Sequence, residues 1–285
     1  MFTVTSINQN QVEQAHDHNM IQLFSSTVQN EKLSIDNNVQ LQSVKFADAI
    51  NASKVIIDKC PSISFLRVPL NVTELHVINC NLTNIDGLQL MQGLTVLNLS
   101  YNNLHDASLL STLTNVIRLS LDGNKIQDIS FVMNMRALQY LVLSYNQISD
   151  LSPLESLTSL IELYLGGNLI SDVSHLRNLV NLGILLLAGN QIENMSPLFA
   201  LINITQLSLS SNKISDISPL SNMNQLQQLR IQMNQITDIS TLQQFVQLQQ
   251  LQLGENCIQN FESLENHPNK ENYELGEQRI PEQNE

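Results

Sequence analysis

The sequence is poor in basic residues and has no long apolar runs. It carries 13 Lys and Arg against 26 Asp and Glu, for a formal net charge of −13, and the basic residues form no cluster. Because nucleic acids and anionic membranes are bound through clustered Lys and Arg, we expect neither as a partner. No stretch approaches the roughly 20 apolar residues of a membrane helix, and residues 1–30 hold no signal-like apolar run. We therefore expect a cytoplasmic protein.

Cysteine is also scarce, and the usual catalytic motifs are missing. The only cysteines are Cys60, Cys80 and Cys257, an odd number that does not fit a disulfide framework. The sequence has no Gly-rich phosphate loop, nucleophile elbow or paired-carboxylate arrangement. We expect neither an enzyme nor a bound cofactor or metal.

One asparagine recurs at a fixed interval. After Asn102, an Asn returns every 22 residues, at Asn124, Asn146, Asn168, Asn190, Asn212, Asn234 and Asn256. The same frame runs backwards to Cys80, Cys60 and Asn38, with one step of 20 residues. A period of this size indicates an array of one supersecondary unit, in which each unit stacks on the next.

The residues before each of these anchor positions alternate in polarity. Leu97 and Leu99 alternate with Val96, Asn98 and Ser100, which predicts a short strand with one buried face. The two apolar columns stay aliphatic through eleven turns. We therefore predict about eleven short strands.

The anchor follows each strand, where the chain must bend. A buried Asn amide offers two donors and an acceptor to the backbone groups that a bend leaves unpaired. We predict a structural ladder that links successive turns, formed by Asn38, Cys60, Cys80, Asn102, Asn124, Asn146, Asn168, Asn190, Asn212, Asn234 and Asn256. Cys is a weaker donor, so the turns at Cys60 and Cys80 should be less well satisfied. Cys257 lies just past the ladder and is expected to be inert.

The second half of each unit carries apolar residues at intervals of three. Ile148, Leu151, Leu154 and Leu157 are one example. This spacing favours a short helical segment that returns on the opposite side. In the segment Ser152–Glu155, the order Ser-Pro-Leu-Glu predicts a Ser N-cap, Pro at the first helical position and a capping-box Glu.

These residues resemble the 22-residue class of the leucine-rich repeat family, with the pattern Leu-x-x-Leu-x-Leu-x-x-Asn-x-Ile-x-Asp-Ile-x-x-Leu-x-x-Leu. Residues 209–220, Leu-Ser-Ser-Asn-Lys-Ile-Ser-Asp-Ile-Ser-Pro-Leu, show it well. The class includes the regulatory subunit 7 of protein phosphatase 1 and the bacterial internalins. The resemblance implies an α/β repeat. Its fold would be a right-handed, curved solenoid with a parallel concave sheet and short helical or 3-10 convex segments, and such solenoids usually bind proteins.

The N-terminal residues differ from the repeats. Met20, Ile21, Phe24 and Val28 recur at helix-compatible intervals. Because an open sheet edge invites unwanted pairing, we predict that residues 1–30 form an N-terminal helical cap, with an amphipathic helix over residues 10–29.

The predicted solenoid spans residues 31–264. Beyond it, His267-Pro268 stops the last turn, and residues 265–285 are polar and acidic. This composition predicts a partly disordered C-terminal tail. Tyr273, Leu275 and Ile280 are its only side chains suited to covering the last strand.

The outward strand positions lie two, four and six residues before each anchor. In most turns they are polar, but over three turns they become apolar. Neighbouring parallel strands lie about 4.8 Å apart, so these residues predict one apolar patch with a polar rim. The predicted protein-binding residues are Tyr140, Val142, Glu162, Tyr164, Ile184, Leu186, Arg118 and Asp122.

Two polar patterns have structural explanations. An Asp follows the anchor by four residues at Asp106, Asp128, Asp150, Asp172, Asp216 and Asp238. We interpret it as a local acceptor for backbone amides rather than a calcium site, because calcium-binding repeats have a shorter, Gly-rich period. His16 and His18 would not face one another on a helix, so we interpret them as solvated residues of the cap.

The sequence predicts a non-enzymatic, monomeric scaffold that binds an unidentified protein on its concave face. Dimerisation through that face is an alternative use of the same patch. A regulatory subunit of a phosphatase 1-type enzyme and an internalin-like adhesion protein are the alternatives that the resemblance adds. The matching columns offer the phosphatase family's acidic and aromatic residues only at Glu74, Asp122, Tyr140, Glu162 and Tyr164.

Overall fold

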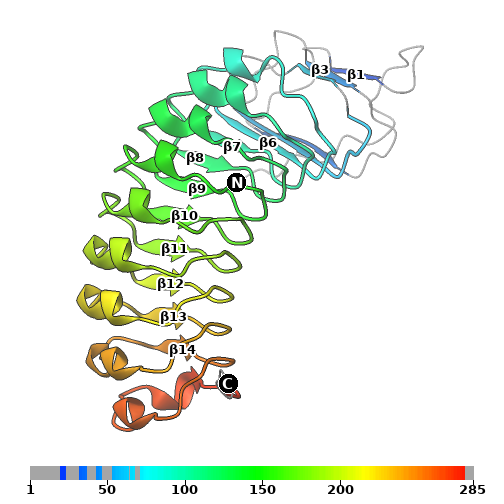
Figure 1. Ribbon diagram of the computed structural model, residues 1–285. Helices are drawn as coiled ribbons and strands as arrows, with labels where there is room; N and C mark the ends of the chain where they lie inside the picture. The colour runs from blue at the N-terminus through cyan, green and yellow to red at the C-terminus, as the bar shows by residue number, and fades with distance from the viewer. Residues whose placement is uncertain are drawn as a thin grey trace, which may run out of the picture. The chain divides into compact units, whose positions relative to one another are not determined.

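The computed structural model describes residues 20–23, 32–36, 43–46, 53–63, 65–67 and 71–279 (Figure 1). For residues 20–23, 32–36, 43–46 and 65–67 it describes the backbone alone. The chain divides into two compact units, Met1–Val142 and Leu143–Glu285.

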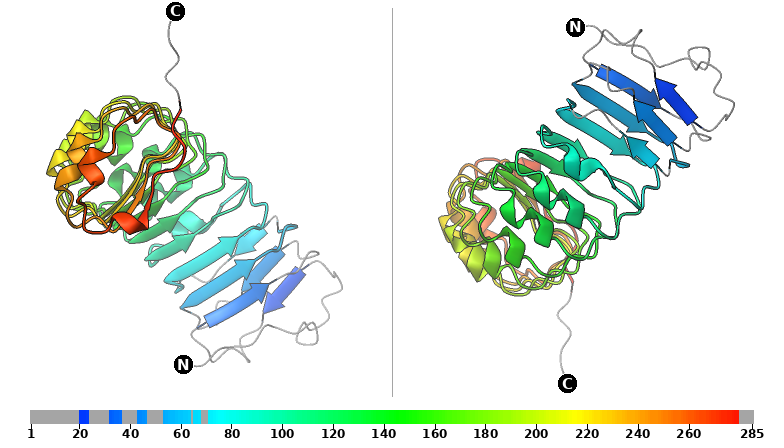
Figure 2. Two further views of the ribbon diagram at one scale, coloured as in Figure 1. Left: turned by 90° about the horizontal axis from the view of Figure 1, so that it is seen from below. Right: turned by 90° about the horizontal axis from the view of Figure 1, so that it is seen from above.

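The first unit contains two parallel sheets. The smaller has the order β1-β3-β5, and the strands of the larger follow the order β2-β4-β6-β7-β8-β9. Figure 2 shows the N-terminal strands of this unit in blue and cyan. The strand bounds are Met20–Leu23 (β1), Lys32–Asp36 (β2), Ser43–Phe46 (β3), Lys54–Asp58 (β4), Phe65–Arg67 (β5), Glu74–Ile78 (β6), Val96–Asn98 (β7), Arg118–Ser120 (β8) and Tyr140–Val142 (β9).

The second unit contains one series of parallel strands, in which each pairs with the next along the chain. The bounds are Glu162–Tyr164 (β10), Ile184–Leu186 (β11), Gln206–Ser208 (β12), Gln228–Arg230 (β13), Gln250–Gln252 (β14) and Tyr273–Glu274 (β15). The predicted parallel strands are therefore confirmed, and β2, β4 and β6 to β14 stand at the eleven predicted positions among the described residues.

Short 3-10 helices form the other side of most turns, as Figure 1 shows for each unit. They are Leu88–Leu90 (η2), Ser108–Thr112 (η3), Ser130–Asn134 (η4), Ser152–Leu154 (η5), Ser174–Leu176 (η6), Ser196–Ala200 (η7), Ser218–Asn222 (η8), Ser240–Gln244 (η9), Glu262–Leu264 (η10) and Lys270–Asn272 (η11). The predicted short helical segments are confirmed in these turns.

The start of η5 agrees with the prediction at Pro153, which stands in the first helical turn, and differs from it at the N-cap. Leu151 occupies the N-cap position of η5 without a side-chain cap hydrogen bond, and Ser152 is already helical. The carboxylate of Asp150 caps the helix instead: it accepts the Ser152 N–H at 2.8 Å and the Ser152 hydroxyl at 2.8 Å. The predicted Ser N-cap is therefore wrong, because Ser152 is itself a helical residue and its own N–H is the group that Asp150 accepts.

The core is built from the two aliphatic columns in register. Leu163 pairs with Leu185, and Leu185 pairs with Leu207, so the same repeat position stacks on itself from strand to strand. These leucines are completely or almost completely buried. Burying such a side chain contributes about 1.5–3 kcal/mol, which is why a 22-residue unit is stable only when stacked.

The anchor side chains link neighbouring turns. Asn190 Nδ2 donates to Leu165 O at 3.0 Å, one turn back, and to Leu187 O at 2.9 Å, in its own turn. Its Oδ1 accepts the N–H of Ile170 at 3.0 Å. In the same column, Cys80 Sγ contacts Ile78 O at 3.1 Å and Ile57 O at a longer 3.7 Å. Asn38 lies outside the described residues.

The N-terminal region differs from the predicted helical cap. Residues 20–23 form strand β1, which pairs in parallel with Ser43–Phe46, so the helix is wrong for those residues. The rest of residues 1–30 lies outside the described part of the chain. In the first turns, strands β1, β3 and β5 occupy the return segments that hold 3-10 helices in later turns.

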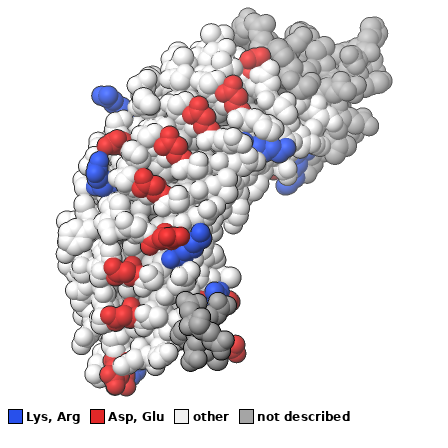
Figure 3. All heavy atoms as spheres, viewed as in Figure 1, with Lys and Arg blue, Asp and Glu red and all other residues white. Residues whose placement is uncertain are grey.

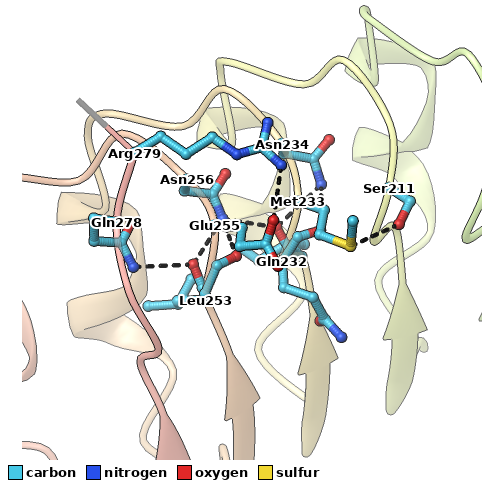
Figure 4. A network of polar contacts seen from close by, with 11 residues as sticks. Ser211, Gln232, Met233, Asn234, Leu253, Glu255, Asn256, Gln278 and Arg279 are labelled. Carbon is cyan, nitrogen blue, oxygen red and sulfur yellow. Dashed lines mark hydrogen bonds and ion pairs between the residues drawn. The ribbon is translucent and has the colours of Figure 1, made fainter. Parts of the chain in front are cut away.

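The C-terminal tail continues the array. Strand β15 pairs with β14, with Leu251 opposite Tyr273 and Gln252 opposite Glu274. Gln278 stands 22 residues after Asn256, and its amide donates to Leu275 O at 2.7 Å and accepts the Ile258 N–H at 3.3 Å. Figure 4 shows its further hydrogen bond to Leu253 O, at 3.3 Å. Disorder is therefore wrong for residues 265–279, and the solenoid extends beyond 264. Residues 280–285, with Ile280, lie outside the described residues.

Candidate functional site

The strand residues that flank each buried leucine point away from the core and form what we call the outward face. In β10 and β11 the central residue is buried and its two neighbours are half-buried. Side chains on short paired strands are held in fixed positions relative to one another, which is the property a recognition surface requires.

In the second unit, the outward face carries an apolar cluster on β10 and β11. Tyr164 lies directly opposite Leu186, and Glu162 lies opposite Ile184. The Tyr164 hydroxyl donates to Glu162 Oε2 at 2.7 Å. Burial, followed by the neighbouring Glu162 carboxylate, raises the pKa of Tyr164 to about 12. The phenol thus stays neutral, and its ring is fixed beside the two aliphatic side chains.

In the first unit, the predicted residues make different contacts. The Arg118 guanidinium lies over the Tyr140 ring, 3.5 Å from its centroid, a cation–π contact between neighbouring strands. Val142 is half-buried and lies one strand from Ser120. Asp122 accepts a short hydrogen bond from the Ser100 hydroxyl. The predicted patch therefore has one part in each unit.

Two exposed tyrosines were missed by the sequence analysis. Tyr101 and Tyr145 directly precede anchors and are 56% and 68% exposed. Each ring covers a glycine of the next turn: a Cβ at Gly123 would lie 2.6 Å from Tyr101 Cδ1, and one at Gly167 would lie 2.7 Å from Tyr145 Cδ1. The alternation of Tyr and Gly at this position was the available signal.

The acidic column has the local role expected of it. The Asp side chain accepts the N–H of the Ser two residues later, at 2.7–2.8 Å. This bond joins Asp106–Ser108, Asp128–Ser130, Asp172–Ser174, Asp216–Ser218 and Asp238–Ser240. These backbone hydrogen bonds lower the pKa of Asp106, Asp150, Asp172 and Asp238 below the ordinary value. Figure 3 shows acidic side chains recurring at regular intervals on the viewed face.

Within the described residues, no group of three or more His, Cys, Asp and Glu side chains is placed to hold a metal ion. His16 and His18 lie outside those residues. Cys60 and Cys80 are buried, and Cys257 is half-buried. The described helices include none that is long and apolar enough to span a membrane.

One surface hollow of about 670 Å³ lies at the C-terminal end of the outward face. Its lining includes Gln232, Gln252 and Glu274, which are joined by amide hydrogen bonds at 3.2 and 2.8 Å. Arg279 crosses it to Glu255, at 3.1 Å (Figure 4). Several polar side chains of the hollow are thus paired with one another rather than free to bind a ligand.

Comparisons with known proteins agree with the repeat architecture. A family profile described as Leucine Rich repeats (2 copies) matches residues 136–178, and one described as Leucine Rich repeat matches residues 92–111. No curated protein matches the chain significantly.

Several solved structures share the fold. An internalin (InlF) from Listeria monocytogenes is 28% identical with a TM-score of 0.80, over 88% of this chain and 74% of that one. Internalin C2 (InlC2) from the same organism is 29% identical with a TM-score of 0.53, over 74% of this chain and 84% of that one. TLR13, in a complex with ssRNA13, is 20% identical with a TM-score of 0.68, over 90% of this chain and 41% of that one.

The parallel strands, the 3-10 segments and the anchor ladder, together with these matches, define a leucine-rich repeat protein. It is similar to internalins in fold and in more than a quarter of its aligned residues.

Proposed function

We propose that this chain is a non-enzymatic scaffold that binds a protein partner on its outward face. The observation that carries the proposal is the apolar cluster Tyr164, Ile184 and Leu186 on adjacent strands of the second unit. A contiguous apolar surface next to polar side chains is typical of protein interfaces. Arg118, Asp122, Tyr140 and Val142 form the corresponding surface of the first unit.

The arrangement of the cluster supports binding rather than simple exposure. The hydrogen bond from Tyr164 to Glu162 fixes the aromatic ring before a partner arrives, which reduces the ordering cost of association. Tyrosine is also among the residues that most often dominate interface energies. Ile184 and Leu186 add apolar area beside it.

The adhesion alternative has a specific observation in its favour, because two of the similar solved structures are internalins. It requires export, whereas our proposal includes a cytoplasmic location. Detection of the protein outside the cell that makes it would overturn that location. None of the structures named above is a phosphatase regulator. If this chain neither binds nor inhibits a phosphatase 1 catalytic subunit, the phosphatase-regulator alternative is removed.

The similarity to TLR13 in its ssRNA13 complex extends to the fold alone. A protein partner is favoured here because the chain has a net charge of −13 and few basic residues, whereas nucleic-acid binding depends on Lys and Arg at the phosphates. Single-stranded RNA is therefore a useful second ligand in the binding assay. We expect it to bind this chain no more tightly than it binds a control protein without net charge.

The decisive experiment is an affinity capture with wild-type protein beside Leu186→Glu and Tyr164→Ala. The matched control is Val246→Glu, which adds the same charge at an exposed apolar residue outside the strands. Burying a glutamate against an apolar partner costs several kcal/mol, so we expect Leu186→Glu to weaken binding of the purified partner at least 100-fold and Val246→Glu to leave it unchanged. Wild-type affinity in both outward-face variants would refute the proposal.

A further inference from the structure

A block of hydrogen-bond donors lies beside the apolar cluster of the second unit. Strands β12, β13 and β14 are in register, so Ser208, Arg230 and Gln252 stand in one row across the strands. Gln206, Gln228 and Gln250 stand in the neighbouring row. The first row continues to Leu186, which lies directly opposite Ser208.

Arg230 is a half-buried cation at the centre of this block. No described residue forms an ion pair or hydrogen bond with its guanidinium. The neighbouring amide in the row bonds to other side chains: Gln252 Oε1 accepts from Gln232 at 3.2 Å, while Gln252 Nε2 donates to Glu274 at 2.8 Å. The guanidinium donors of Arg230 therefore remain available on the outward face.

Ser208 gives a second, independent observation. It is only 7% exposed, and its hydroxyl makes no hydrogen bond to any described residue. Ser208 is in direct register with Arg230. The Ser208 hydroxyl is not among the described buried side-chain atoms that lack a partner, so its oxygen reaches the surface although most of the residue is covered. A surface hydroxyl and a cation that both lack a partner among the described residues, side by side, can donate together to one ligand acceptor.

The charge around Arg230 is unusual for this chain. The outward strand residues of β11 to β14 include no carboxylate, although the whole chain has 26 acidic residues. Three other arginines of the described region have partners: Arg118 lies over Tyr140, Arg177 pairs with Glu155 and Arg279 pairs with Glu255. The block around Arg230 is thus a local positive site on an acidic protein.

We propose that Arg230 binds a carboxylate of an acidic side chain in the protein partner, with Ser208 as an additional donor. The planar guanidinium can hold a carboxylate by two parallel hydrogen bonds, which gives strength and orientation. This inference rests on the proposed protein-binding function and specifies its partner. Leu186 and Arg230 lie two strand spacings apart, roughly 10 Å, so the partner presents an apolar and an acidic residue at about that separation.

The test uses a phage-displayed library of random peptides selected on the full chain, with wild type, Arg230→Gln, Arg230→Glu and Leu186→Glu in parallel. The matched control is Arg177→Gln, which removes one positive charge from an exposed residue of the same unit. Because the Arg230 side chain bonds to no described residue, we expect Arg230→Gln to keep the wild-type Tm.

We expect peptides selected on the wild type to be enriched in Asp and Glu, and Arg230→Gln to weaken their Kd roughly 10-fold or more, in keeping with the loss of one partner of an interfacial charge pair. Arg230→Glu should enrich Lys and Arg instead, and Arg177→Gln should behave as wild type. The inference would be overturned, and the proposed function left intact, by peptides that fail to bind Leu186→Glu but show no enrichment in Asp and Glu. The same holds for peptides that bind Arg230→Gln as tightly as they bind the wild type. A selection that yields no Leu186-dependent peptide would overturn both. Selected peptides should also be made as synthetic pairs, one with the acidic residue and one with a phosphorylated serine in its place. Binding of the phosphorylated member alone would also overturn the carboxylate assignment.

Discussion

Replacing Asn190 with Ala removes one rung of the anchor ladder, and the structure allows its cost to be estimated. The amide oxygen of Asn190 is the acceptor for the N–H of Ile170, at 3.0 Å, and Ile170 is fully buried. Its amide nitrogen donates to Leu165 O and Leu187 O at 3.0 and 2.9 Å. Alanine offers none of these groups.

The three backbone groups do not lose equally. Leu165 O also accepts from Asn168 at 2.9 Å, and Leu187 O also accepts from Asn212 at 3.0 Å, so each carbonyl keeps one hydrogen bond. Only the Ile170 N–H loses its sole acceptor, which costs about 1–3 kcal/mol for a buried donor. The two carbonyls add about 0.5–1 kcal/mol each. The expected loss for Asn190→Ala is therefore about 3 kcal/mol.

The assay is equilibrium unfolding in urea, followed by circular dichroism, with Asn203→Ala as the control. Asn203 is exposed and its amide makes one hydrogen bond, to Val180 O at 2.9 Å, so its loss should cost less than about 1 kcal/mol. Asn190→Cys should fall between wild type and Asn190→Ala, because the same column holds Cys80, whose thiol contacts Ile78 O. If Asn190→Ala and Asn203→Ala destabilise the protein equally, the ladder does not stabilise it as argued.

Four further predictions test other parts of the chain. Gly276→Ala would place a Cβ 2.6 Å from Gly254 Cα at a φ of +57°, so urea unfolding should show a loss of about 1–3 kcal/mol, whereas Gly183→Ala, with its nearest atom at 3.9 Å, should change stability far less. The lowered pKa values of Asp150, Asp172 and Asp238 stabilise the folded state at pH values above the ordinary pKa of 3.8, and this stabilisation disappears as the pH falls through the folded-state pKa values. A variant with all three replaced by Asn should therefore lose less Tm than the wild type between about pH 5 and 2. Burial lowers the pKa of His267, so the last turn should have its full stability above pH 6.5 and lose stability as the pH falls towards the folded-state pKa. Hydrogen exchange of the Leu253 N–H, which donates to Glu274 O, corrected for the intrinsic pH dependence of exchange, should show this loss in the wild type and not in His267→Gln. Cys60 and Cys80 are fully buried and should react with a thiol reagent only after unfolding, whereas the half-buried Cys257 should react in the native protein, and equal rates would contradict this.

Much of the fold could be predicted because its signals are local and repeated. Leu97 and Leu99 alternate with polar residues in a short strand, and the same pattern in every turn predicts strands in register. The first turns were less predictable. Met20 and Ile21 fit a helix by their spacing, but residues 20–23 pair with Ser43–Phe46 as a strand. Short apolar runs carry little information about which of the two forms because the pairing partner lies more than 20 residues away.

The C-terminal end shows a different limit. Composition predicted disorder for the tail because it is polar and acidic, yet Gln278 stands one period after Asn256 and bonds as an anchor does. Following the frame by one more period would have found it. Glutamine is longer than asparagine, and whether its amide can reach Leu275 O and Ile258 N–H depends on the path of the backbone.

The candidate site was predictable only in part. The outward residues followed from the period of two, and Tyr164 and Leu186 lie side by side in the sheet. The division of the predicted outward residues between two compact units is a property of the fold. The hydrogen bond from Tyr164 to Glu162 and the Tyr101 ring over Gly123 depend on distances that no sequence pattern contains. The same is true of Arg230, which is one arginine among several in the sequence.

The sequence by itself determined the period, the buried columns and the positions that point outward, because a 22-residue repeat can bury its leucines only by stacking. Tertiary structure decided which polar groups find partners. Arg230 looked ordinary in the sequence, but in the fold its row neighbour Gln252 bonds to Gln232 and Glu274. Hydrogen bonds and ion pairs depend on distances within a few tenths of an ångström between different turns, and the folded backbone alone sets those distances.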